Sequence, residues 1–377
     1  MNFIDLKRQY QAYREEIDQA VLGVMDSRRF ILGQEVEALE RELSSFTGAP
    51  FAVGVSSGTD GLLLSLMALG AGKDTVVVTT PFSFFATVEA IMLLGAEPAF
   101  CDIERESFNL DPHLLEDRIN ELEGLGKKVS GVIAVSLYGQ CADMDAINRI
   151  SKRRGLFVIE DACQSLGASY KGRMSGNLSL LSVTSFFPSK PLGCFGDGGM
   201  VFSQDEHLFE RIKAMRVHGD TGRYDHRYLG LNARLDAIQA AVLRTKLRHF
   251  EKEIALRQEA ADRYMDLLSP LERKGMIGLP HIKKGCRSVF AQFTIRILEK
   301  DRDQVARALS ELGIPTAIHY PRPLPLLEPL KGYGFRRGEF PVAEEAARQV
   351  LSLPMHAFIE EREQEEVART LFKVLDR

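Results

Sequence analysis

A lysine in an aromatic, proline-containing segment is the first residue whose type and setting could support chemistry. Lys190 lies within residues 185–191 (SFFPSKP), shortly before residues 196–199 (GDGG). Free lysine has a pKa of about 10.4, so a nucleophilic lysine needs desolvation or a nearby positive group. The apolar surroundings favour a Schiff-base lysine. A loop lysine whose amine reaches water is the alternative.

A carboxylate follows a run that predicts a buried strand. Residues 156–159 (LFVI) precede Glu160 and Asp161, so Asp161 is expected at the carboxyl end of that strand, where parallel sheets bind ligands. A carboxylate there could pair with the protonated pyridine nitrogen of a cofactor. Gln164 could donate a hydrogen bond to a ring oxygen. The alternative for Asp161 is a helix cap or a structural ion pair.

Small and hydroxyl residues precede a helix predicted over residues 60–69. Residues 56–59 (SSGT) would place backbone N–H groups and hydroxyls at the start of that helix, which is a setting that binds phosphate. An ordinary N-cap explains the same residues. Residues 79–85 (TTPFSFF) predict a strand-end loop, and one of its aromatic rings could stack on a flat cofactor.

The elements that must position these residues alternate between strands and helices. An amphipathic helix is expected over residues 34–46, and short apolar runs predict strands at 75–79, 98–103, 131–137, 156–159, 182–187 and 199–203. This order predicts an α/β fold with a mostly parallel sheet covered on both faces. The GDGG segment precedes a strand, so a hairpin-like turn is favoured over a nucleotide-binding loop.

The pattern changes after about residue 250. A charged helix is expected over residues 251–268, a half-buried strand over 289–296, and helices over 301–312 and 360–375. We therefore expect a large domain, residues 1–250, and a smaller C-terminal α/β domain, residues 251–377.

Composition limits the classes of function. The 377 residues are 45% hydrophobic and 27% charged with a formal net charge of −4, which gives no electrostatic case for a nucleic-acid partner or a membrane surface. The five cysteines lack CxxC spacing, so neither a disulfide framework nor a metal site is expected. The first residues lack the apolar run of a signal peptide and no apolar stretch reaches eighteen residues, so neither a signal peptide nor a membrane span is expected. A cytoplasmic location is expected.

Taken together, these motifs resemble one known family. Ser-Gly-Thr before a helix, the aromatic strand-end loop, residues 160–164 (EDACQ), and SFFPSK followed by GDGG are similar to the DegT/DnrJ/EryC1/StrS family of PLP-dependent nucleotide-sugar aminotransferases. The resemblance runs from residues 3–6 (FIDL) to 353–356 (LPMH). It implies PLP fold type I, the aspartate aminotransferase-like architecture.

The resemblance also implies roles for individual residues. Lys190 would hold PLP covalently and carry the proton between the substrate carbon and C4′ of the cofactor. Around it, Asp161 would bind the pyridine nitrogen, Gln164 would lie near the ring hydroxyl, Phe84 would stack on the ring, Gly58, Thr59, Asp60 and Ser185 would form the phosphate site, and Asn232 would reach the phosphate of a neighbouring subunit. A homodimer with shared active sites follows from the last of these.

A narrower resemblance concerns the substrate. Residues 135–143 (VSLYGQCAD), 188–193 (PSKPLG), 232–234 (NAR) and 318–321 (IHYP) are similar to a subgroup that aminates the C3 ketone of UDP-2-acetamido-2-deoxy-hexuronic acid for O-antigen synthesis, with L-glutamate as donor. It implies that His319 and Tyr320 bind substrate. Both substrates carry a carboxylate, and a planar guanidinium suits that group, so Arg234 is the candidate partner. A structural ion pair is the alternative for Arg234.

Two departures and three rival functions stay open. Residues 290–293 (FAQF) lack the histidine of many family members, and Arg28 and Arg29 stand where a glycine is common. The rivals are amination at C4 of a 4-keto-6-deoxy nucleotide sugar, a non-catalytic PLP- or sugar-binding regulatory protein, and a sugar 3-dehydratase. Because the dehydratases carry histidine at the lysine position, Lys190 argues against the third.

Overall fold

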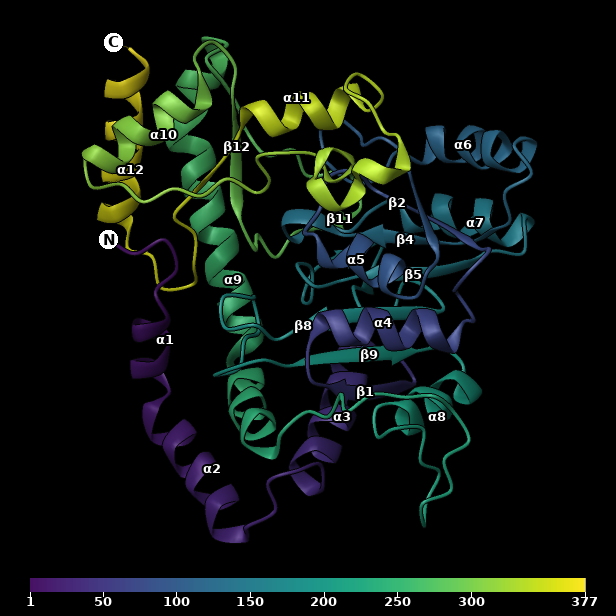
Figure 1. The fold of residues 1–377 in the computed structure, drawn as a ribbon. Coiled ribbons are helices and arrows are strands. Elements are labelled where there is room, and N and C mark those ends of the chain that lie inside the picture. The colour runs from purple at the N-terminus through teal and green to yellow at the C-terminus, as the bar shows by residue number, and fades with distance from the viewer. Residues whose placement is uncertain (377) are drawn as a thin grey trace.

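A seven-stranded sheet forms the centre of the molecule in the computed structural model, which describes residues 1–376. Its strand order is β1-β9-β8-β5-β4-β2-β3 (Figure 1). The strands are β1 Phe51–Val55, β2 Val76–Thr79, β3 Glu97–Phe100, β4 Val129–Val135, β5 Phe157–Asp161, β8 Leu181–Ser185 and β9 Gly199–Ser203. Strands that follow one another in the chain are therefore often not adjacent in the sheet.

The sheet is mixed and mostly parallel, which confirms the predicted fold class. Strands β3, β2, β4, β5 and β8 pair in parallel, whereas β9 runs antiparallel to both of its neighbours, β8 and β1. Because Ser185 pairs with Gly199, residues 186–198 form the connection of a long hairpin. Lys190 lies on that connection, and the GDGG segment leads into β9.

Helices cover both faces of this sheet. Successive side chains of a strand point to opposite faces, and the strands are apolar at most positions, so both faces must be buried. In β2, Val77 packs into a cluster with α4 Gly58–Ala68, α5 Ala86–Leu93 and α8 Glu206–Met215. Its neighbours Val76 and Val78 pack on the opposite face. That face is covered by α3 Gln34–Thr47, α6 Pro112–Gly124, α7 Met144–Arg153 and the start of α9 Ala237–Arg273 (Figure 1).

A second, smaller sheet follows in the chain and has its own apolar core. It has the order β10-β12-β13, all antiparallel, and packs against α10, α12 and the end of α9. The bounds are β10 Ile277–Gly278, β12 Phe293–Ile297, β13 Val350–Leu353, α10 Arg302–Glu311, α11 Pro341–Gln349 and α12 Glu361–Leu375. The remaining elements are α1 Leu6–Ala12, α2 Arg14–Ser27, β6 Ser169–Tyr170, β7 Arg173–Met174, β11 Cys286–Arg287 and the short 3₁₀ helices η1 Leu137–Gly139, η2 Leu324–Leu326 and η3 Glu328–Tyr333.

One helix of 37 residues, α9, joins the two apolar cores. The sequence predicted the charged part of α9. Its first turns were missed, because they are buried, rich in alanine and lack a regular pattern of charged residues. The strand expected from residue 289 begins at Phe293, because the backbone N–H of Val289 donates to Gly139 instead of joining the small sheet. The expected division between residues 250 and 251 falls inside α9 and stays an expectation.

Three further observations concern residues 1–376. None of their helices combines the length and the apolar character needed to cross a bilayer. No group of three or more His, Cys, Asp and Glu side chains within them could hold a metal ion. All five cysteines are free thiols.

Candidate active site

A cavity of about 500 Å³ opens at the carboxyl ends of the parallel strands. The segments that follow β1, β2, β5 and β8 each contribute side chains to it, and residues from the smaller sheet region close one side. Its lining includes Gly58, Thr59, Phe84, Asp161, Gln164, Ser185, Lys190, His319 and Tyr320, all of which the sequence singled out. A cavity of this size is within the usual range for a ligand or cofactor site.

Asp161 is the last residue of β5 and is held by two donors. The hydroxyl of Thr87, on α5, donates to Oδ2 at 2.8 Å, and the backbone N–H of Cys163 donates to Oδ1 at 3.2 Å. Thr87 in turn lies 3.2 Å from the hydroxyl of Ser83. The carboxylate is buried, 5% exposed, yet it has no basic partner among the described residues. It is therefore placed to accept a proton or a cationic N–H group from a ligand.

The preceding acid, Glu160, faces away from this cavity because side chains alternate along a strand. Its carboxylate accepts from the hydroxyls of Ser175 and Ser182 at 2.7 and 2.8 Å and from two backbone N–H groups. Burial raises the pKa of Glu160, and these hydrogen bonds oppose that shift. Of the two neighbouring acids, Glu160 is thus structural and Asp161 faces the cavity.

Lys190 reaches the cavity from a tight turn in the β8–β9 connection. Its backbone N–H donates to the carbonyl of Phe187 at 2.8 Å. A second lysine, Lys246 on α9, donates from Nζ to the carbonyl of Gly193 at 2.6 Å and lies over the ring of Phe195. The buried amine of Lys246 therefore ties the end of the Lys190 loop to the long helix.

We expect the buried Lys246 to make stability depend on pH. Burial lowers the pKa of Lys246 to about 8, against 10.5 for an exposed lysine. Between these two values the unfolded chain binds more protons than the folded one, so the free energy of unfolding contributed by this group rises with pH, by up to ~3 kcal/mol. Urea unfolding at pH 7.5 and pH 10 should show a larger rise for the wild type than for Lys246→Met. Equal rises would contradict this account of Lys246.

The start of α4 offers backbone N–H groups to the cavity. Ser57 caps the helix by accepting from the backbone N–H of Asp60 at 3.0 Å, and Gly58 and Thr59 form the first turn. A Cβ on Gly58 would lie 2.9 Å from both Cys163 Sγ and Ser185 Cβ, so only glycine lets the helix start approach Ser185 this closely. The site suits an anion such as a phosphate.

An amide and two aromatic rings form another part of the lining. Gln164 donates from Nε2 to the Tyr320 hydroxyl at 3.0 Å, and its Oε1 accepts from the backbone N–H of Tyr138 at 3.0 Å. Phe84 is 57% exposed and its ring centre lies 6.3 Å from that of Tyr320. Gln164 therefore has one remaining N–H for a ligand, and Phe84 presents an open ring face.

The imidazole of His319 also lines the cavity. Burial, and then the charge of Lys190, lowers the pKa of His319 to about 4. The ring is therefore neutral near pH 7 and cannot act as a cation for a carboxylate. Lys190 is the one lysine or arginine that lines this cavity within the described residues.

Three of the expected residues do not line this cavity. Asp60 accepts from the Ser56 hydroxyl at 2.5 Å, and its place in the phosphate site stays a prediction. Asn232 is exposed and Arg234 is partly exposed, on the segment that returns from the 218–230 loop towards α9. Within one chain they are therefore free for a role outside their own cavity.

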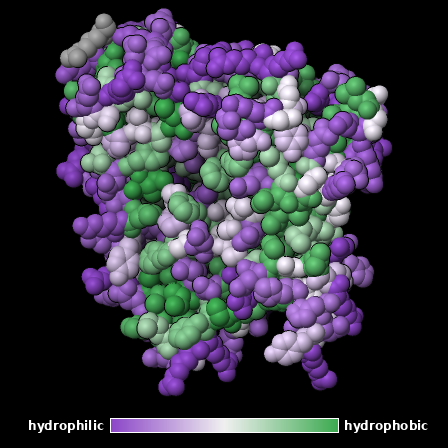
Figure 2. Space-filling model, in the orientation of Figure 1, coloured by the Kyte–Doolittle hydropathy of each residue, from purple (hydrophilic) through white to green (hydrophobic). Residues whose placement is uncertain are grey.

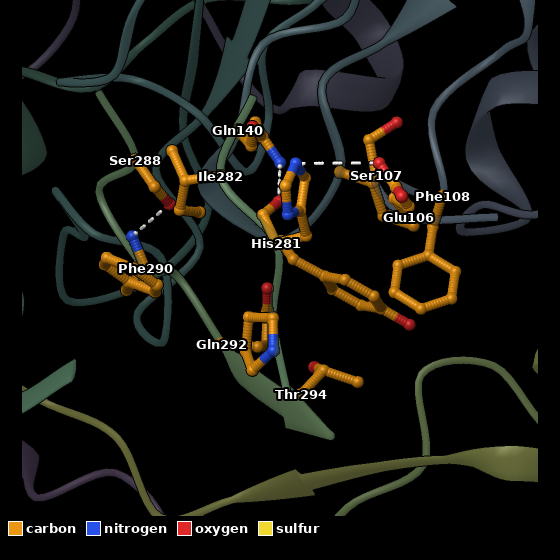
Figure 3. Close-up of a pocket in the computed structure, with 13 residues that line it drawn as sticks. Glu106, Ser107, Phe108, Gln140, His281, Ile282, Ser288, Phe290, Gln292 and Thr294 are labelled. Atoms are coloured by element: carbon orange, nitrogen blue, oxygen red, sulfur yellow. Dashed lines mark hydrogen bonds and ion pairs between the residues drawn. The ribbon is translucent and has the colours of Figure 1, made fainter. Parts of the chain in front are cut away.

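Sequence reasoning missed Thr87 and Gln292, both of which line the cavity. Thr87 could have been found as the residue four positions after Ser83 on the helix that follows the aromatic loop. Gln292 lies in residues 290–293, which the sequence marked as a departure from the family, but no role was assigned to this residue. It precedes β12 and lines both this cavity and a smaller one of about 20 Å³ (Figure 3).

The side chains present fit PLP, the cofactor that the sequence resemblance implies. A carboxylate suits the protonated ring nitrogen, a helix start with hydroxyls suits the phosphate, and an amine suits the aldehyde. The buried carboxylate of Asp161, which has no basic partner among the described residues, and the close approach of Gly58 to Ser185 are the two observations that carry this fit.

Comparison with known proteins gives one consistent result. The family model described as the DegT/DnrJ/EryC1/StrS aminotransferase family matches residues 11–372. The UDP-2-acetamido-2-deoxy-3-oxo-D-glucuronate aminotransferase of Pseudomonas aeruginosa is 46% identical over 360 residues, which are 96% of each chain.

Two solved structures have the same fold. A DegT/DnrJ/EryC1/StrS aminotransferase from Brucella abortus superposes with a TM-score of 0.95 at 36% identity, covering 100% of both chains. NtdA from Bacillus subtilis, crystallised with bound cofactor PMP, superposes with a TM-score of 0.92 at 28% identity, covering 100% of this chain and 85% of that one.

Proposed function

Since this chain belongs to the DegT/DnrJ/EryC1/StrS aminotransferase family, we propose that it transfers the amino group of L-glutamate to C3 of UDP-2-acetamido-2-deoxy-3-keto-hexuronic acid, for O-antigen synthesis. The protein is a nucleotide-sugar aminotransferase with PLP as its cofactor. The 46% identity to the Pseudomonas aeruginosa enzyme, over 96% of both chains, supports this particular keto sugar as the substrate.

One geometric observation carries the assignment of residues. Lys190 lines the same cavity as the buried carboxylate of Asp161 and the start of α4. A lysine alone, or an acid at a strand end alone, has an ordinary structural explanation. A shared cavity that also contains an anion-binding helix start suits a PLP site, and the family to which the chain belongs makes transamination the reaction.

The residues divide the work in the following way. Bound PLP supplies an electron sink that stabilises negative charge on the carbon that loses its proton. Asp161 would accept from the protonated ring nitrogen, Gly58 and Thr59 would donate backbone N–H groups to the phosphate, and Ser185 would add a hydroxyl. Lys190 would hold the cofactor, and its Nζ would take up and return the substrate proton. The two substrates enter in turn, in a ping-pong scheme.

The carboxylates of glutamate and of the sugar need a cation, and Lys190 is the one lysine or arginine that lines the cavity among residues 1–376. His319 is neutral near pH 7, and Lys190 would be bonded to the cofactor. We therefore assign this role to Arg234 of a second copy, which would enter together with Asn232 of that copy. Both residues follow the 218–230 loop, in which Tyr224 and Leu229 are 90% and 88% exposed.

Exposed apolar residues support the homodimer that this assignment requires. Leu22 and Met25 on α2 are 59% and 53% exposed, and Leu93 at the end of α5 is 64% exposed. Figure 2 shows apolar residues gathered on this face near α2 and near α4 and α5. Such surface is typical of a region that another chain covers.

A panel of keto sugars tests the substrate. With L-glutamate and PLP, we expect turnover of the UDP-linked 3-keto uronic acid and at most trace turnover of UDP- or dTDP-linked 4-keto-6-deoxy sugars. Release of 2-oxoglutarate and the mass of the amino sugar are the measurements. Faster turnover of a 4-keto-6-deoxy sugar would replace the C3 assignment with the C4 alternative.

Mixing two inactive variants tests the shared active site. We expect Lys190→Ala and Asn232→Ala homodimers to be inactive or nearly so. After subunit exchange, half of the dimers would be mixed and each would carry one intact site, so activity should return to about a quarter of the wild-type value. Lys190→Ala mixed with Ser185→Ala is the matched control. If Asn232 acts on its own subunit's cavity, the two mixtures will behave alike.

A cytoplasmic location is part of this proposal. The five free cysteines fit a reducing compartment, because secreted proteins commonly pair their cysteines in disulfides. Nucleotide sugars are also made from nucleoside triphosphates, which are held inside the cell.

A further inference from the structure

His319 is attached to a chain of two buried hydroxyls that leads away from the active site. Its Nδ1 lies 3.1 Å from the Ser352 hydroxyl, which lies 2.8 Å from the Thr294 hydroxyl. Ser352 and Thr294 are 0% and 3% exposed. The imidazole is thus held through Nδ1, and Nε2 is the ring nitrogen left for a ligand.

The small sheet fixes the positions of both hydroxyls. Thr294 on β12 and Ser352 on β13 are directly paired across the antiparallel ladder, so their side chains lie on the same face. The backbone of Ser352 also pairs with Ala317, two residues before His319, through hydrogen bonds of 3.1 and 2.8 Å. The carbonyl of His319 accepts from the Tyr138 hydroxyl. Neither the imidazole nor the two hydroxyls can therefore shift easily.

Which hydroxyl donates to which group follows from the acceptors that each hydroxyl can reach. If Thr294 donates to Ser352 and Ser352 donates to Nδ1, each hydroxyl proton has an acceptor. In the reverse direction the Thr294 proton has no acceptor among the hydrogen bonds of the described residues. A buried donor without an acceptor costs more than a spare lone pair on a hydroxyl oxygen.

The surroundings of Thr294 agree with this direction. Thr294 also borders the smaller cavity, together with Gln292 from the same segment (Figure 3). The rings of Phe108, Tyr138 and Phe290 line that cavity as well. Polar groups border the cavity too, including the unpartnered Oε1 of Gln292, yet the hydroxyl to which the Thr294 hydroxyl is hydrogen-bonded is that of Ser352.

We propose that Thr294 and Ser352 are positioning residues that hold His319 as the Nε2–H tautomer, so that a neutral N–H donor faces an acceptor oxygen of the sugar substrate. The proposal rests on the proposed function, because it assigns the sugar to the cavity that His319 lines. A neutral donor selects a carbonyl, carboxylate or hydroxyl oxygen over a cationic group. Because burial lowers the pKa of His319 to about 4, the ring also stays neutral around pH 7.

Nitrogen NMR of ¹⁵N-histidine-labelled protein, loaded with PLP but without sugar, tests the tautomer directly. The His319 signals are those lost in His319→Gln. We expect the wild type to show protonated Nε2 and unprotonated Nδ1, and Ser352→Ala and Thr294→Val to show mixed tautomers. Thr294→Ser, which keeps the hydroxyl, should restore the wild-type pattern. A wild-type ring protonated at Nδ1, or unchanged tautomers in both hydroxyl-free variants, would overturn the proposal.

Steady-state kinetics supply the second readout. Loss of one hydrogen bond should raise KM for the sugar roughly 3- to 10-fold in Thr294→Val and Ser352→Ala, with kcat nearly unchanged and Thr294→Ser like the wild type. An unchanged KM in the first two would overturn the role towards substrate. The NMR result does not depend on which sugar is the substrate, so failure of the C3 assignment in the sugar panel is distinguishable from failure of this proposal. Thr294→Val is near isosteric, which keeps the test available if Ser352→Ala does not fold.

Discussion

Replacing Lys190 by alanine is expected to lower turnover by about 10⁴-fold or more, because it removes both the covalent hold on the cofactor and the group that carries the proton. The visible absorption of lysine-bound PLP should disappear at the same time. Binding of PLP itself should weaken less than turnover, since Asp161 and the start of α4 are untouched. Absorption spectra and 2-oxoglutarate release measure these effects.

Two control variants separate this role from a general effect of charge. Lys190→Arg keeps a positive side chain in the same loop but offers no amine, so it should be as inactive as the alanine variant. Lys252→Ala removes an exposed lysine on α9 and should behave like the wild type. Substantial turnover by Lys190→Ala or Lys190→Arg would show that another residue carries the chemistry.

Replacing Asp161 by asparagine is expected to lower kcat by about 10²- to 10⁴-fold while the protein stays folded. The substitution keeps the shape of the side chain but removes the charge that keeps the cofactor ring nitrogen protonated. An amide can still interact with Thr87 and with the backbone N–H of Cys163. The absorption spectrum of bound PLP should shift as well, because it reports the protonation of the ring.

The neighbouring acid supplies a matched control. Glu160→Gln removes one charge from the same strand, but Glu160 accepts four hydrogen bonds from the opposite face of the sheet. That variant should lower the free energy of unfolding by about 1–3 kcal/mol and leave the spectrum of bound PLP unchanged. If Asp161→Asn kept its turnover and Glu160→Gln lost it, the assignment of the two acids would be reversed.

Local patterns predicted the elements around the site well. The alternation of apolar strands and helices indicated the mostly parallel sheet, and β5 and the start of α4 lie where the sequence placed them. The buried beginning of α9 and the late start of β12 were missed, because tertiary contacts decide both. Thr87 was missed for a similar reason, since its role depends on Asp161, which lies 74 positions later in the chain.

The sequence by itself determined which residue types stand at the ends of which elements. The lysine in its aromatic turn, the acid after the apolar run and the hydroxyls before a helix are local features, set by backbone geometry and by the residues that can begin or end an element. These features were sufficient for the resemblance to PLP-dependent sugar aminotransferases.

Only the tertiary structure decided how these features combine. The strand order β1-β9-β8-β5 brings the start of α4 beside Asp161 and Lys190, and the small sheet then adds His319 and its two hydroxyls. The tertiary structure also placed Glu160 on the opposite face of the large sheet and left Asn232 and Arg234 outside the cavity of their own chain. The physical reason is that sheet order and the packing of helices on the sheet depend on contacts between distant segments, which no local pattern contains.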